Sequence, residues 1–251
     1  MSVGQKTALV TGAARNIGLA ISQRLAEAGY RVAMTARSHE ELSSQAEALQ
    51  ASGAQTVGIV GDALDEHSVA GVVAEAEKHF GSIDVLVNCA AARHHGPLTE
   101  TSLEDWNRIM GTTLTGAFLF SRAVLPGMVG RRWGRIVNLA GMSGQTGASE
   151  RAALVSAKAG LMGFTRAVAI EYAAAGITCN AISPGLIDTQ RPTTSGDQEV
   201  AARHYAERAA VIPVGRLGTT DEIAALCEFL CSEESGFITG QVIGANGGLR
   251  L

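Results

Sequence analysis

TALVTGAARNIG, residues 7–18, is the most informative stretch of this sequence. Its first residues form a short apolar run typical of a buried strand, and a turn containing glycine then leads into residues with helical periodicity. Such a turn lets the backbone approach a pyrophosphate, which the free N–H groups and positive dipole of the helix N-terminus can bind. We therefore expect a nucleotide-phosphate site formed by Gly12, Arg15, Asn16, Ile17 and Gly18.

The same alternation of strand and helix continues along the whole chain. Strand-like runs occupy residues 7–12, 31–36, 56–62, 84–89, 134–140, 177–185 and 241–244, and helical stretches occupy residues 19–29, 40–52, 69–80, 103–129, 152–175 and 221–231. Buried parallel strands read as apolar runs, and their alternation with helices is typical of an α/β fold. The sequence predicts one Rossmann-type, doubly wound domain over residues 1–251, with seven mainly parallel strands and helices on both faces.

Composition excludes several classes of partner. The chain has 251 residues, of which 46% are hydrophobic and 18% charged, with a net charge of −4 and a pI near 5.9. This balance gives no basic surface for nucleic acid or anionic lipid, and we see no stretch that approaches the roughly 20 apolar residues of a membrane span. We expect a cytoplasmic protein that acts on a small molecule, with no nucleic-acid or membrane partner and no bound metal.

One segment interrupts the alternation of strands and helices. Residues 190–216 are more polar than their surroundings and contain Thr193, Thr194, Ser195, Gly196 and Asp197 in succession. Long polar connections of this kind are often functional, so we expect a lid over a site.

Further motifs follow in a fixed order. Asp62-Ala63 comes after the third predicted strand, Asn88-Cys89-Ala90-Ala91 after the fourth, and Pro184-Gly185 followed by Thr189 after the sixth. Together with Thr11, Gly12 and Gly18, these motifs resemble those of the short-chain dehydrogenase/reductase family, including its 3-oxoacyl-acyl-carrier-protein reductases. The resemblance covers essentially the whole chain and implies that a nicotinamide cofactor is bound.

The resemblance also names the cofactor-binding positions. They are Gly12, Arg15, Asn16, Ile17, Gly18, Arg37, Asp62, Ala63, Asn88, Ala90, Lys158, Pro184, Gly185 and Thr189. Asn16 stands where the family has a glycine, but asparagine tolerates a positive φ. NAD-preferring relatives carry a carboxylate at the end of the second strand, where this chain has Arg37, and Arg15 resembles a second phosphate clamp. NADP(H) is therefore favoured, NAD(H) remains possible, and the alternative role for both arginines is a solvated surface charge.

The catalytic positions depart from the family pattern. The family uses a tyrosine, a lysine four residues later, a serine thirteen residues upstream and an asparagine on the preceding helix. Lys158 is the retained lysine, whereas Leu154 takes the tyrosine position, Gly141 the serine position and Thr113 the asparagine position. Only the lysine of the four is present. If only these side chains are missing, replacing the three with the family residues should restore activity.

Other residues are candidate replacements for the missing proton donor. His94 and His95 follow the fourth strand at its carboxyl end, where sites form in such sheets, and Tyr205 belongs to the lid. Each is more commonly a surface residue in such a position.

Three functions remain open. The first is a supporting subunit that binds cofactor and pairs with an intact paralogue, because the resemblance implies dimers or tetramers formed through the helices at 103–129 and 152–175. The second is an active oxidoreductase of a small carbonyl or hydroxyl compound, with a replaced proton donor. The third is a non-redox enzyme that reuses the pocket.

Overall fold

The computed structural model describes residues 5–189 and 205–250. Its seven strands form one sheet with the order β3-β2-β1-β4-β5-β6-β7. They are β1 (Thr7–Thr11), β2 (Arg31–Ala36), β3 (Thr56–Val60), β4 (Val85–Asn88), β5 (Gly134–Leu139), β6 (Ile177–Pro184) and β7 (Val242–Ala245). The predicted doubly wound sheet is confirmed, and every neighbouring pair is parallel, where we expected mainly parallel pairing.

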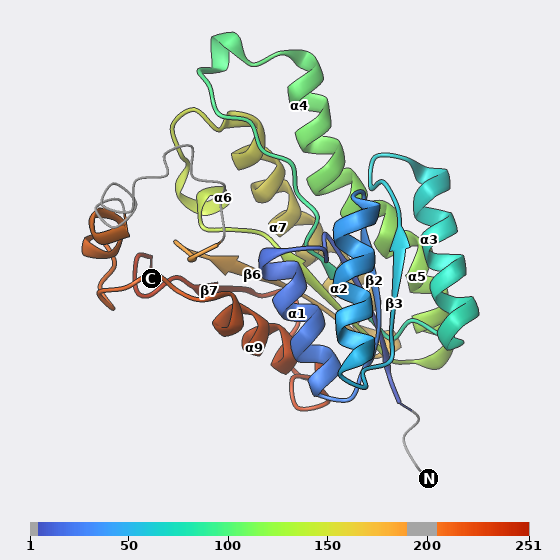
Figure 1. Cartoon of the computed structure of the whole chain (residues 1–251). Coiled ribbons are helices and arrows are strands. Elements are labelled where there is room, and N and C mark those ends of the chain that lie inside the picture. The colour runs from blue at the N-terminus through green and yellow to red at the C-terminus, as the bar shows by residue number, and fades with distance from the viewer. Residues whose placement is uncertain (1–4, 190–204, 251) are drawn as a thin grey trace.

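Helices cover both faces of this sheet (Figure 1). They are α1 (Asn16–Glu27), α2 (His39–Ala51), α3 (Glu66–Phe80), α4 (Leu103–Met110), α5 (Gly116–Arg131), α6 (Ser143–Thr146), α7 (Ala152–Tyr172) and α9 (Thr220–Cys231), with short turns η1 (Leu98–Glu100), η2 (Gly111–Thr115) and η3 (Ala173–Ala175). The predicted helix at 103–129 thus contains a π-helical turn, η2, between α4 and α5.

Alternating strand residues build two cores. Ala8 and Val10 of β1 pack with α1, α2 and α9, whereas Leu9 between them packs with α3, α5 and α7. Successive side chains of a strand point to opposite faces, so apolar residues at every position fill the space under both helical layers. This is why the strands read as continuous apolar runs.

The helix ends follow local sequence signals. Thr219 and Glu222 form a reciprocal capping box at the start of α9, and the Asp65 side chain accepts a hydrogen bond from His67 N at the start of α3. Helix α3 ends at Gly81, whose φ of 81° is the left-handed conformation that glycine adopts without strain.

One helix departs from the composition-based expectation. Ala152–Ala175, which spans α7 and η3, is long and apolar enough to cross a membrane by length and composition, although 50% of the apolar window is buried inside the fold. The expectation that no stretch approaches such a length was wrong. The buried side of α7 packs against β6 and the second core, as the covering helix of a sheet does.

The strand order reverses between β1 and β4, which neighbour each other in the centre of the sheet. Ligands of open parallel sheets bind at the carboxyl ends of the strands beside such a reversal. The chain after β1 and the chain after β4 therefore lie where a nucleotide site is expected.

Candidate cofactor and active site

The turn after β1 is built for close backbone approach. Gly12 has a φ of 64°, and a Cβ there would lie 3.0 Å from Ala90 Cα. A Cβ on Gly18 would lie 2.2 Å from Gly12 O, so no side chain fits at position 18 in the first turn of α1. Asn16 has a φ of 51°, in agreement with the prediction that asparagine here tolerates a left-handed backbone.

A threonine joins this turn to the chain that follows β4. The Thr11 hydroxyl accepts hydrogen bonds from Cys89 N and Ala90 N, both at 3.0 Å. Asn88 lies buried beneath, where its Nδ2 donates to Asn138 Oδ1 of β5 at 2.9 Å. Two strand ends are thus fixed relative to each other at the site.

Arg15 and Arg37 lie on the rim of the same edge. Arg15 immediately precedes α1 and Arg37 immediately follows β2, and Thr11 at the end of β1 pairs with Thr35 near the end of β2. Both side chains are exposed. Neither guanidinium has a hydrogen-bond or ion-pair partner among residues 5–189 and 205–250, so each keeps its N–H donors for a ligand or for water.

The chain after β3 supplies an oriented carboxylate. Asp62 Oδ1 accepts a hydrogen bond from Leu64 N at 3.0 Å, and Asp62 N donates a hydrogen bond to Ser68 Oγ at 2.9 Å. Ala63 is buried against Gly116, where a Cβ would lie 2.8 Å from the Ala63 Cβ. The close contact between Ala63 and Gly116 holds this segment against α5.

The predicted residues after β6 meet the turn after β5. Pro184 O accepts from Met142 N at 3.0 Å, and Gly185 N donates to Ala245 O at 3.0 Å. Thr189 is half-buried and is the last residue before the segment 190–204, which lies outside the described residues. Most of the predicted lid at 190–216 therefore cannot be placed, although residues 205–210 are helical.

Lys158 projects from α7 into the protein interior. Its residue is 9% exposed, and Nζ donates a hydrogen bond to Leu139 O at the end of β5. Burial lowers the pKa of Lys158 to about 8, with the charge of Arg93 acting in the same direction and Cys89 opposing it. This shift favours the neutral amine.

Leu154 lies one helical turn before Lys158 and is buried in an apolar cluster. Its neighbours there are Ala92, Ile109, Ala153 and Ala157, with Trp106 and Met110 packed against them. An aliphatic side chain can neither donate nor accept a proton. The position where the resemblance calls for a tyrosine is therefore part of a small hydrophobic core between α4 and α7.

Gly141 has a backbone that suits glycine alone. Its φ is +133°, while a Cβ there would meet no atom of residues 5–189 and 205–250 within 4 Å. A side chain at this position has room but would be strained, because L residues rarely adopt such a φ. A serine placed here would need a change of backbone conformation as well, and the restoration of activity by the three replacements stays a prediction.

Thr113 lies on the π-helical turn η2. The residue is 2% exposed, and its Oγ1 is buried without a hydrogen-bond partner within the described part of the chain, as is Oγ1 of Thr112. π-Helical turns within α-helices occur frequently at functional sites. The turn is present although the asparagine of the resembled pattern is replaced.

The structure does not bring the three candidate replacement donors to Lys158. His94 Nδ1 lies 3.6 Å from Asp105 Oδ2 of α4, and His95 Nδ1 accepts from Arg151 Nε at 3.3 Å. Tyr205 is 42% exposed. Lys158 Nζ donates its hydrogen bond to Leu139 O, and the charged groups that act on its pKa are Cys89 and Arg93.

Two residues near Lys158 were missed as site candidates. Cys89 and Arg93 both follow β4, and their electrostatic effects on Lys158 place them close to its amine. Burial raises the pKa of the Cys89 thiol to about 11, partly offset by Lys158. The sequence did carry a signal for Cys89, because this residue occupies the second asparagine position of the family motif that follows β4.

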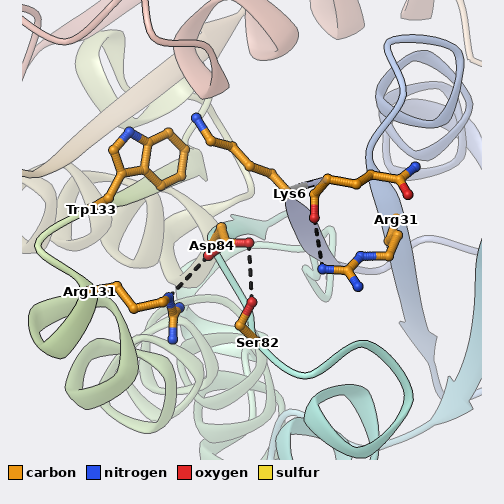
Figure 2. A pocket seen from close by; sticks show the side chains of 7 residues that line it. Lys6, Arg31, Ser82, Asp84, Arg131 and Trp133 are labelled. Carbon is orange, nitrogen blue, oxygen red and sulfur yellow. Dashed lines mark hydrogen bonds and ion pairs between the residues drawn. The ribbon is translucent and has the colours of Figure 1, made fainter. Parts of the chain in front are cut away.

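A separate hollow of about 250 Å³ lies at the opposite edge of the sheet. Lys6, Asp84 and Trp133, which precede β1, β4 and β5, line it together with Arg31, Ser82 and Arg131 (Figure 2). Asp84 bonds to Ser82 Oγ at 3.4 Å and to Arg131 Nε at 3.2 Å. It is at the amino ends of the strands and so takes no part in the cofactor site.

The comparisons with known proteins agree with this architecture. Residues 12–250 match a family model described as enoyl-(acyl carrier protein) reductase. A putative gluconate dehydrogenase from Agrobacterium tumefaciens superimposes with a TM-score of 0.91 at 30% identity, covering 98% of this chain and 96% of that one. A parallel seven-stranded sheet with a glycine turn after β1 and these matches define the class, and the chain belongs to the short-chain dehydrogenase/reductase family.

Within that family the similarity is to reductases of acyl thioesters. The chain is 38% identical to the 3-oxoacyl-[acyl-carrier-protein] reductase FabG of Vibrio cholerae over 251 residues, which is 100% of both chains. It is 42% identical to the acetoacetyl-CoA reductase of Shinella zoogloeoides over 246 residues, 97% of this chain and 98% of that one. The predicted resemblance is confirmed.

Proposed function

We propose that this protein binds NADP(H), lacks ordinary carbonyl reductase activity when alone, and supports an intact relative as a subunit of an oxidoreductase assembly. One observation carries the proposal: Leu154 fills an apolar cluster at the position where a proton has to reach the substrate oxygen. Hydride transfer to a carbonyl leaves an alkoxide that needs a proton, and acid catalysis of that step typically contributes ~10²- to 10⁴-fold.

The residues on the cofactor side fit a dinucleotide. Gly12 and Gly18 form a cradle that a Cβ would fill, and α1 begins directly behind it, where the first N–H groups of a helix have no partner within that helix. Arg15 and Arg37 offer free guanidinium donors for a 2′-phosphate, and a guanidinium matches a phosphate with paired N–H groups. When bound, the nicotinamide would supply the hydride in a redox reaction.

The remaining cofactor positions have separate tasks in this proposal. Asp62 and Ala63 would contact the adenine, and Asn88 and Ala90 would line the ribose side. Pro184, Gly185 and Thr189 would lie along the nicotinamide, and Lys158 would bond to its ribose. NAD(H) is the competing cofactor, and the two arginines are the reason to prefer NADP(H).

The helices that would carry a partner are unusually apolar. α5 and α7 have apolar residues all round, and Ile170 of α7 is 84% exposed while Phe118 and Val129 of α5 are also exposed. A helix that is apolar on every side is normally buried. A second chain, either another copy or an intact paralogue, would cover these side chains in a dimer or tetramer with twofold symmetry.

A second candidate function is an active reductase of a small carbonyl compound that uses another proton donor. The lowered pKa of Lys158, about 8, favours it, because this amine can exchange a proton near neutral pH. No comparable observation in the described residues supports a non-redox reaction. The cytoplasmic location and the lack of a nucleic-acid or membrane partner remain predictions from composition.

The test compares the chain alone with the chain in a mixture. NADPH and NADH binding would be titrated by cofactor fluorescence, and NADPH oxidation would be followed with acetoacetyl-CoA. We expect binding of NADPH without turnover, and co-purification with an intact family member encoded nearby. Turnover by the isolated protein in the ordinary enzyme range of roughly 1 to 10³ s⁻¹ would favour the second candidate instead.

A further inference from the structure

The hollow at the amino ends of the strands carries more positive than negative charge. Its lining includes the cations Lys6, Arg31 and Arg131 and a single carboxylate, that of Asp84 (Figure 2). The chain as a whole has a net charge of −4, so this concentration of cations is local. A concave surface lined by charges of one sign concentrates ions of the opposite sign.

We propose that this hollow binds a phosphate group, either as free phosphate or as the monoester of a small metabolite. The site is separate from the cofactor site, because Arg31 begins β2 whereas Arg37 follows the end of the same strand. The two arginines thus serve opposite edges of the sheet, and the inference does not depend on whether a nicotinamide cofactor is bound.

Arg31 supplies donors that the described part of the protein does not use. Its Nη2 donates a hydrogen bond to Gln5 O at 2.7 Å, and its Cζ lies 5.7 Å from the centre of the Phe80 ring. Within residues 5–189 and 205–250 it has no carboxylate partner, and its buried Nε has no hydrogen-bond partner. Native proteins seldom leave a buried donor unpaired, and an ordered water or ion is a usual partner. Arg31 is therefore the residue whose hydrogen bonding a bound anion would complete.

Lys6 and Ser82 add further donors to the hollow. Lys6 Nζ pairs with Glu233 and lies 3.6 Å from the centre of the Trp133 ring, and an ammonium group has three N–H donors. Ser82 Oγ donates to Asp84 Oδ2 at 3.4 Å, which is long for a hydroxyl hydrogen bond. Because this bond is weak, the hydroxyl can turn from Asp84 towards a bound anion.

Four cations at and beside the hollow have two carboxylate partners among the described residues. The cations are Lys6, Arg31, Arg131 and Arg135, and the carboxylates are Asp84 and Glu233. Asp84 Oδ1 accepts a hydrogen bond from Arg131 Nε at 3.2 Å, and its Oδ2 accepts from Thr7 N at 2.9 Å. Glu233 pairs with Lys6 and also lies 3.8 Å from Arg135 Nη2. The group therefore has an excess of positive charge that a dianion would balance.

A phosphate group matches this excess better than a carboxylate does. At pH 7 a phosphate monoester carries about −1.5 to −2 charges and three strong acceptor oxygens, and a guanidinium binds such oxygens through paired N–H groups. The hollow of about 250 Å³ is smaller than the roughly 300–1,000 Å³ of pockets for drug-sized ligands. It therefore suits free phosphate or a small monoester rather than a dinucleotide.

The two tryptophans of the chain allow a test that observes the hollow directly. Trp133 lines the hollow beside Lys6, whereas Trp106 packs against the apolar cluster around Leu154. The whole protein would be labelled with 5-fluorotryptophan and titrated with inorganic phosphate, glycerol phosphate and acetate. Chloride would hold the ionic strength constant, because salt screens exposed charges. The Trp106→Phe variant assigns the two fluorine signals.

We expect phosphate or its monoester to shift the Trp133 signal saturably and to leave the Trp106 signal in place. The tighter of the two ligands identifies the source of the phosphate group, and acetate should bind more weakly. Arg31→Gln should weaken phosphate binding ~10- to 100-fold, the usual effect of removing a charge-assisted hydrogen bond. No saturable shift of Trp133 in the otherwise unaltered protein, or equal affinity for acetate, would overturn the proposal even if Arg31→Gln does not fold.

Arg37→Gln is the matched control and separates this inference from the proposed function. It removes the same charge directly after β2, on the rim of the cofactor site. The Trp133 response to phosphate should survive both this substitution and saturation with NADP⁺. If either abolishes the response while Arg31→Gln keeps it, phosphate binds at the cofactor rim and the inference is wrong. If the response persists in a protein that binds neither NADPH nor NADH, the inference stands and the proposed function fails.

Discussion

The turns after β1 and β5, which both lie at the carboxyl edge of the sheet, differ in why they disfavour a side chain. After β1, a Cβ on Gly12 or Gly18 would approach neighbouring backbone atoms too closely, so packing requires glycine at both positions of that turn. After β5, a Cβ on Gly141 would have open space among the described residues, but the φ of this residue is +133°, so conformation is what requires glycine there. The first turn excludes side chains by packing, whereas the second has a backbone conformation that a serine would rarely adopt.

The turn after β1 and the positions that resemble catalytic residues also differ in what surrounds them. The cradle is fixed by contacts from two strands, through Thr11 to Cys89 and Ala90. The positions resembling the catalytic ones are filled by Leu154 in an apolar cluster and by Thr113, whose hydroxyl has no hydrogen-bond partner among the described residues.

The largest expected effect is on carbonyl reduction. The isolated protein should reduce acetoacetyl-CoA at least ~10²- to 10⁴-fold more slowly than an intact family member, because Leu154 cannot supply a proton. Leu154→Tyr should raise NADPH oxidation, since Lys158 lies one turn away to lower the new phenol's pKa. Leu154→Phe, which adds the ring without the hydroxyl, is the matched control.

Both substitutions enlarge a packed side chain, which typically costs ~1–3 kcal/mol. Thermal unfolding of the two variants should therefore shift alike, whereas NADPH oxidation should increase in the tyrosine variant alone. Equal activity in the two variants would show that the hydroxyl is not what the site lacks.

The second effect concerns the cradle. Gly18→Ala would put a Cβ 2.2 Å from Gly12 O, and the turn would have to move to relieve it. We expect a loss of ~1–3 kcal/mol of stability and much weaker NADPH binding. Gly71→Ala on α3 is the control, because a Cβ there meets nothing within 4 Å and alanine favours a helix.

Calorimetry and NADPH titration of the two glycine variants check this expectation. If Gly18→Ala binds NADPH as the unaltered protein does, the turn after β1 is not the phosphate cradle.

The sequence was sufficient for the fold and for this cradle because both follow from local patterns. Apolar runs placed the strands, and the glycines of residues 12–18 have direct geometric reasons. Other features depend on residues far apart in the chain. The φ of Gly141, the electrostatic effect of Cys89 on Lys158 and the cluster around Leu154 arise only when β4, β5 and α7 come together. Sequence spacing located Leu154 and Gly141 but could not show what surrounds them.

A third effect tests cofactor choice on the cradle side. Arg37→Ala should weaken NADPH binding by ~10- to 100-fold and leave NADH binding nearly unchanged, since a charge-assisted hydrogen bond contributes ~1.5–3 kcal/mol. Arg132→Ala, on an exposed arginine after α5, is a control for net charge. Fluorescence titrations of both cofactors at one salt concentration would measure the ratio. An unchanged ratio would assign Arg37 to the solvated surface.

The smallest expected effect concerns Gly141 in the turn after β5. Gly141→Ser should cost ~1–2 kcal/mol of stability, because the serine must accept a φ of +133° or pull the turn into another conformation. In combination with Leu154→Tyr, the serine should add activity only if the turn relaxes to the conformation that intact relatives use. Chemical denaturation of the single and double variants measures the coupling between the two positions. If the double variant is more stable than the sum of the two single effects predicts, the tyrosine stabilises the turn conformation that the serine needs. The side chains then determine the backbone conformation after β5. Strict additivity, with no gain in NADPH oxidation over Leu154→Tyr alone, would mean that the turn holds its shape independently and that the tyrosine, lysine and serine positions no longer form one site.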